Sequence, residues 1–178
     1  YAVDRCRQNI NIENAMLFEI KSFYKSEFLL GLRAVEHINE LEHVNLPEDE
    51  AGFIALHIVN AESDATMNQV MSMPGMLKDI LSIVRMSIGG EINEQSIEYE
   101  RFVVHLKYML RRTMEDVAYS GTQEEMFAKF CDKEQHAYSI AKKIRKYVYE
   151  KVKKDIPEEE MVYLMVHLSR IEHYGMKH

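Results

Sequence analysis

The 178-residue sequence has no tryptophan, only two cysteines, three prolines and seven glycines. So few prolines and glycines argue against a turn-rich β fold and favour long helices. Because Cys6 and Cys131 lie far apart and form no CxxC motif, we expect them to be packing residues in a reducing, cytoplasmic setting. No apolar run approaches the roughly 20 residues that span a bilayer, and no signal peptide is recognisable, so direct membrane insertion is not expected.

Positive charge is also in short supply. Lys and Arg number 22 against 29 Asp and Glu, which gives a formal net charge of -7. A surface that binds nucleic acid needs a basic patch, so nucleic acid is not expected as a direct ligand of this chain. The richest basic stretch, residues 142–154, has helical spacing and is interpreted as the solvated face of a helix. A docking face for an acidic partner is the alternative.

Several motifs that carry catalysis or bind metals are missing. The sequence contains no GxSxG motif, no P-loop and no HExxH motif. A single ExxH, from Glu40 to His43, lacks the second copy and the additional glutamates that a di-iron bundle needs. We therefore predict that the protein is not an enzyme, with no catalytic residue, no metal ligand and no cofactor.

Apolar residues recur at helical spacing along most of the chain, and no segment shows convincing strand alternation. This pattern predicts an all-α fold built from two tandem antiparallel helical bundles of similar fold. Small polar residues between Glu62 and Met67 predict a linker, which divides the chain into domains 1–66 and 67–178. Helices are predicted over residues 13–24, beyond Ser26, and over 47–62, 67–88, 94–115, 123–152 (one or two helices) and 157–175.

An internal repeat is the most informative feature. Residues 45–58 align without a gap with residues 155–168, so that proline, an acidic triplet and a histidine recur at a fixed offset of 110 residues. His57 and His167 fall on the same position, ten residues after their prolines and among aliphatic side chains. Leucine or methionine would fill a core equally well, so an imidazole in both copies suggests that its chemistry is used. A core histidine satisfied by one hydrogen bond is the alternative.

Imidazole can serve in acid/base catalysis, in metal binding or as a nucleophile. The missing motifs give the first two little support. Nucleophilic attack on phosphate stays open, because it requires only a ring nitrogen that a donor protein can reach. The sequence on its own leaves these alternatives standing.

Four segments resemble the PTS regulation domains of the LicT/BglG family of transcriptional antiterminators. Residues 46–62 look like the signature of the first such domain, and residues 14–24 match its early part. Residues 101–108 resemble the first histidine motif of the second domain, and residues 156–171 resemble its second histidine motif. The motifs are long and in the family's order, and the resemblance spans essentially the whole chain.

The resemblance implies that His57, His105 and His167 are phosphorylation sites, one in the first domain and two in the second. It also implies a homodimer with two PTS partners. By this resemblance, the phosphocarrier HPr is expected to modify the second domain and activate the protein, and a sugar-specific PTS enzyme II is expected to act through the first domain and inhibit it. A further histidine and a small RNA-binding domain are expected before Tyr1. The repeat offset independently places the counterpart of His105 there.

Arg101 lies one helical turn before His105, and Arg170 lies three residues after His167. Either arginine could meet a phosphate or a partner chain, with ordinary surface salt bridges as the alternative. Two rivals to the main interpretation stay open: the same module in a PTS-regulated, DNA-binding activator, and a helical metal-binding protein. Surface roles are expected for the remaining histidines, His37, His43, His136, His173 and His178.

Overall fold

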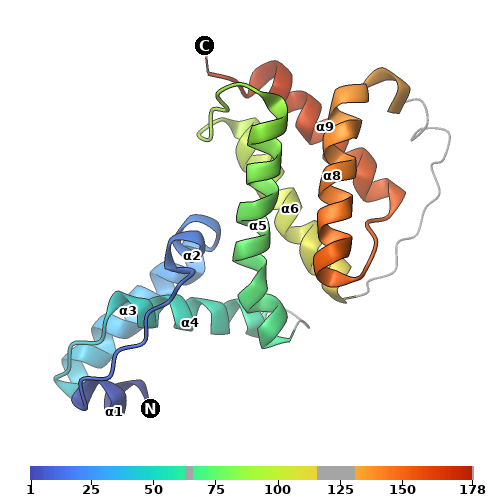
Figure 1. Ribbon diagram of the computed structural model, residues 1–178. Coiled ribbons are helices and arrows are strands. Elements are labelled where there is room, and N and C mark those ends of the chain that lie inside the picture. Colours follow the sequence, from blue (N-terminus) through green and yellow to red (C-terminus); the bar gives the residue numbers. More distant parts are fainter. Residues whose placement is uncertain (63–65, 116–130, 178) are drawn as a thin grey trace. The chain divides into compact units, whose positions relative to one another are not determined.

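The computed structural model of the chain describes residues 1–62, 66–115 and 131–177. Within these ranges the fold is all-α, as the sequence predicts (Figure 1). None of the described helices combines the length and the apolar character needed to cross a membrane. The helices are α1 (Ala2–Arg7), α2 (Leu17–Phe23), α3 (Lys25–Glu42), α4 (Glu48–Ala61), α5 (Met67–Ile88), α6 (Ile97–Glu115), α8 (Gln135–Val152) and α9 (Glu158–Tyr174).

The chain divides into two compact units, Tyr1–Gly75 and Met76–His178. Helix α5 runs through the point of division and contains Pro74 in its interior. The domain boundary expected between residues 66 and 67 stays a prediction. The predicted start of a helix near residue 123 lies outside the described residues.

The two prolines of the repeat open equivalent helices. Pro47 and Pro157 have nearly identical extended backbones (φ -70, ψ 160 and φ -66, ψ 160) immediately before α4 and α9. Three acidic residues follow each proline in the first helical turn, where they complement the positive end of the helix dipole. The sequence had suggested that each proline forms the first residue of its helix. In the structure each proline instead precedes its helix by one residue. Gly89, directly after the last residue of α5, has φ 74, the left-handed conformation typical of a helix terminator.

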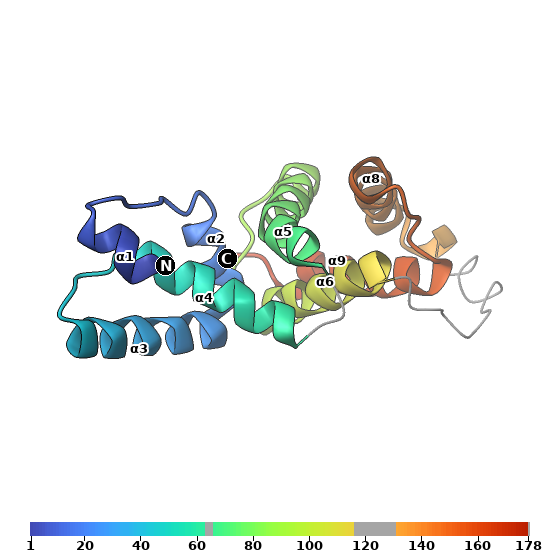
Figure 2. The same ribbon diagram turned by 90° about the horizontal axis from the view of Figure 1, so that it is seen from below.

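In the first unit, α3 and α4 lie side by side (Figure 2). Gly31 makes this close approach possible, because a Cβ at this position would lie 2.3 Å from the carbonyl oxygen of Ala51. Buried apolar residues from α2 to α5 complete the core, among them Ile20, Tyr24, Phe28, Val35, Ala55, Leu56 and Val70.

Replacing Gly31 with alanine is expected to lower the free energy of unfolding by about 2 kcal/mol, because α3 and α4 must separate to admit the methyl group. Chemical denaturation followed by circular dichroism measures the change. Gly75→Ala is the matched control, since its Cβ would approach only the flexible end of Met16, at 3.4 Å. The control should be neutral or slightly stabilising, by about 0.5 kcal/mol, since alanine is the better helix former. Equal stability of the two variants would contradict the proposed close contact.

In the second unit, α9 packs against both α6 and α8. The buried face of α6 repeats at helical spacing through Phe102, Leu106, Met109 and Leu110, and each of these residues has an exposed fraction of 0%. Helix α9 contributes Met161, Leu164, Met165, Leu168 and Ile171, which are buried to the same degree. The contact between α6 and α9 positions the site.

Candidate functional site

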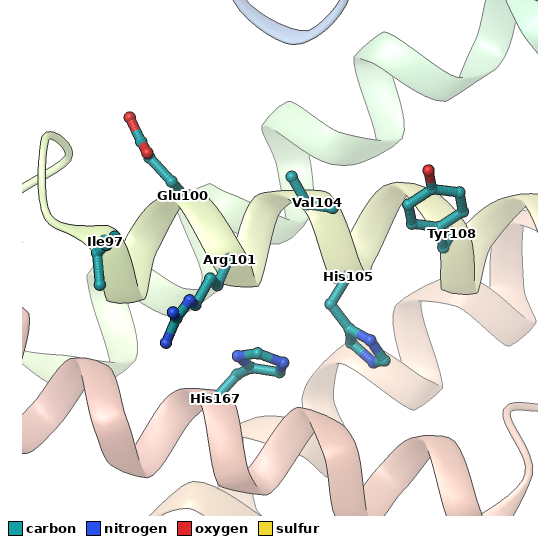
Figure 3. A pocket seen from close by; sticks show the side chains of 7 residues that line it. All are labelled: Ile97, Glu100, Arg101, Val104, His105, Tyr108 and His167. Carbon is teal, nitrogen blue, oxygen red and sulfur yellow. The ribbon is translucent and has the colours of Figure 1, made fainter.

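His105 of α6 and His167 of α9 lie face to face. Their ring centroids are 5.1 Å apart, and the ring planes differ by 28°. Figure 3 shows both rings, together with the Arg101 side chain, pointing into the space between the two helices. The sequence assigned both histidines to one domain but gave no sign that they are in contact.

Each histidine stands at the edge of the packed face of its helix. His105 directly precedes Leu106 and follows Phe102 by three residues, and His167 directly precedes Leu168. The neighbours are fully buried, whereas both histidines are only partly buried. Aromatic rings frame the pair: Tyr163 lies 5.5 Å from the His105 ring, and Phe102 lies 6.4 Å from the His167 ring, measured between centroids. The imidazoles are therefore held in place without being sealed from solvent.

An open groove runs along α6 beside the two rings. Its cavity volume is about 420 Å³. Ile97, Val104 and Tyr108 remain 50–58% exposed along this part of α6, so apolar side chains and imidazoles face the same space. A donor protein or a second chain could reach the rings here. The groove is lined by Ile97, Glu100, Arg101, Val104, His105, Tyr108 and His167.

Glu160 is the site residue that the sequence analysis missed. Its side chain is 1% exposed, one carboxylate oxygen contacts the Arg112 guanidinium, and the other lies 3.0 Å from Nε2 of His105. The approach to His105 is close but lacks the alignment of a conventional hydrogen bond. Glu160 is the counterpart of Glu50 in the repeat, and Glu50 is also buried, 2.7 Å from Arg5. The signal available in the sequence was the glutamate that occupies the third position of the acidic triplet in both copies of the repeat.

The surroundings of His167 are positively charged instead. Burial, with smaller contributions from the nearby charges of His105, Arg170 and Arg101, lowers the pKa of His167 from its ordinary 6.5 to about 4. The ring is therefore neutral at pH 7 and keeps a nitrogen lone pair. The same cations would attract a phosphate group. Roles for Arg101 and Arg170 as phosphate or interface partners stay predictions.

The depressed pKa of His167 predicts a pH dependence of stability. Between pH 6.5 and about 4, the unfolded chain binds a proton at this ring and the folded chain does not. The free energy of unfolding should therefore fall as the pH drops through this window, by a modest amount because the ring is only partly buried. Urea denaturation of the wild type and of His167→Gln at several pH values measures the effect. Identical pH slopes for the two proteins would contradict the depressed pKa.

His57 lies on α4 in the first unit, where its side chain is exposed. Within the described residues it makes no hydrogen bond or ion pair, and its role as a phosphorylation site stays a prediction. His37, His43, His136 and His173 are also exposed, and His178 lies outside the described residues. Across the part of the chain that the structure describes, no group of three or more His, Cys, Asp or Glu side chains is arranged to hold a metal ion.

The fold and the site together define a helical module that presents paired imidazoles beside cationic side chains. A family model described as the PRD domain matches residues 1–61 and 78–171, and the chain belongs to this family. The resemblance to the PTS regulation domains of the LicT/BglG antiterminators is thereby confirmed.

Three relatives illustrate the match. "Transcription antiterminator LicT" of Bacillus subtilis (strain 168) is 36% identical over 171 residues, covering 96% of this chain and 62% of that protein. "Beta-glucoside operon antiterminator" of Dickeya chrysanthemi is also 36% identical over 171 residues, covering 96% and 60%. "GlcA/glcB genes antiterminator" of Staphylococcus carnosus (strain TM300) is 28% identical over 182 residues, covering 99% and 61%. The chain spans about three fifths of the length of these relatives.

Proposed function

We propose that this chain is the non-enzymatic regulatory part of a sugar-operon transcriptional antiterminator. Phosphate on histidine would tune its dimerisation, and dimerisation would control an attached RNA-binding domain. Membership of the PRD family supports a regulatory module, and the three relatives are named antiterminators, which favours this assignment over a DNA-binding activator. The net charge of -7 is consistent with RNA binding by a separate domain.

The stacked pair of His105 and His167 in an open groove is the observation that carries the proposal. Phosphorylation adds about 1.5 to 2 negative charges and three acceptor oxygens to a near-neutral ring. Beside apolar side chains such a charge must find a cation or force the packing to change. Arg101 and Arg170 are near enough to act on His167 electrostatically, and both are exposed. Phosphate here would therefore bias a two-state dimer.

Two donors would act on different histidines. The phosphocarrier HPr would modify His105 and His167 and activate the protein. A sugar-specific PTS enzyme II would act through the first domain, where His57 is the acceptor in this chain, and would inhibit. The protein would work in the cytoplasm.

Incubation with phosphorylated HPr tests this function. We expect acid-labile phosphate on the wild type, detected by intact mass and assigned to His105 and His167 by peptide mapping. The double variant His105→Ala/His167→Ala should lose most of it, whereas His136→Ala, which removes an exposed histidine paired with Glu172, should keep it. Full incorporation into the double variant, or none into the wild type, would sink the assignment.

A further inference from the structure

The two histidines of the pair differ in what faces them. His105 faces the Glu160 carboxylate, which is 1% exposed, whereas His167 is influenced by Arg101 and Arg170. An acid and two cations thus act on rings whose centroids are only 5.1 Å apart. Because the charges that face them differ, His105 and His167 are expected to differ in reactivity as phosphate acceptors.

The two nitrogens of His105 differ as well. Nε2 is buried and lies 3.0 Å from Oε2 of Glu160. Nδ1 of His105, unlike Nε2, is not a buried atom lacking a hydrogen-bond partner. The ring also lines the open groove. A carboxylate beside one imidazole nitrogen favours the tautomer with its proton on that nitrogen. The lone pair is then left on Nδ1.

We propose that Glu160 is the positioning residue of His105: the nearby carboxylate favours a proton on Nε2, leaves Nδ1 to accept phosphate, and makes His105 react before His167. This proposal rests on the proposed function. Arg112, in contact with the other carboxylate oxygen, fixes the orientation of Glu160.

The step balances without a further reactant. The Nδ1 lone pair attacks the phosphorus of a protein phosphohistidine, the donor's P–N bond breaks, and its electron pair returns to the donor imidazole. The accepting ring gains positive charge as the new N–P bond forms, and its proton stays on Nε2 facing the carboxylate. Glu160 therefore stabilises charge that develops during the transfer. At His167, the neighbouring cations oppose the same charge.

The linkage itself is the first test, and it needs no variant. Wild-type chain with ¹⁵N-labelled histidine is phosphorylated by phosphorylated HPr, and ³¹P–¹⁵N NMR identifies the bonded nitrogen at His105. The proposal predicts Nδ1, and phosphate on Nε2 of His105 would overturn it. A wild type that takes up no phosphate would contradict both this proposal and the proposed function.

The second test compares Glu160→Gln with Glu50→Gln. Both replace a buried first-turn glutamate that pairs with an arginine, so both should cost similar stability. Only Glu160→Gln should slow phosphorylation of His105, by about tenfold or more, and remove its lead over His167. Peptide-resolved time courses on the folded variants measure both rates. An unchanged order and rate in Glu160→Gln, or an equal slowing in Glu50→Gln, would contradict a positioning role.

Discussion

Replacing Phe102 with alanine is expected to lower the free energy of unfolding by about 4 kcal/mol, because a fully buried ring leaves a large cavity. Phe102 has an exposed fraction of 0% and lies on the α6 face that meets α9. Its ring centroid is 6.4 Å from that of His167, so the cavity would open beside the candidate site. The variant should also raise the pKa of His167 toward its ordinary value, because water entering the cavity relieves the burial that lowers it.

Chemical denaturation and an NMR titration of the His167 ring measure these two effects. Tyr108→Ala is the matched control on the same helix, since Tyr108 is 58% exposed. The control should change stability by about 0.5 kcal/mol or less. A loss below about 1 kcal/mol for Phe102→Ala would be inconsistent with the packing of α6 on α9.

Replacing Arg112 with alanine is expected to destabilise the protein by about 3 kcal/mol, because it removes the arginine that contacts the buried Glu160 carboxylate. Glu160 is 1% exposed, and its contact with Arg112 joins α9 to α6. The neighbouring Arg111 provides the control. It pairs with Glu115 at 3.2 Å within the same helix and is 41% exposed.

Arg111→Ala should cost about 0.5 kcal/mol, the usual contribution of an exposed pair one helical turn apart. Thermal or urea unfolding of both variants under the same conditions provides the comparison. Equal losses in the two variants would show that the Glu160 ion pair has no special role. A difference of the expected size between the two losses of stability would show that the ion pair between Arg112 and Glu160 stabilises the contact of α6 with α9, in addition to apolar packing.

Much of the fold follows from the local pattern. Apolar periodicity predicted the helices, and the recurrence of proline, acids and histidine predicted equivalent starts for α4 and α9. The histidines of the site came from the repeat and the family motifs. These features are encoded within one helix each, so they can be recognised without knowing which helices touch.

The features that sequence reasoning missed all depend on contacts between helices. Gly31 tolerates no side chain only because Ala51 of another helix lies against it. In the sequence, Glu160 is only one member of a recurring acidic triplet, because nothing local shows that α6 supplies Arg112 and His105 to its two oxygens. The stacking of His105 on His167 likewise depends on how α6 and α9 pack, which helical periodicity leaves open.

Sedimentation velocity of the chain before and after phosphorylation by HPr is the most direct test that histidine phosphate controls assembly. The account predicts a larger dimer fraction after phosphorylation at equal protein concentration, and no shift for His105→Ala/His167→Ala. Phosphate bound at His105 and His167 with an unchanged distribution of monomer and dimer would contradict it.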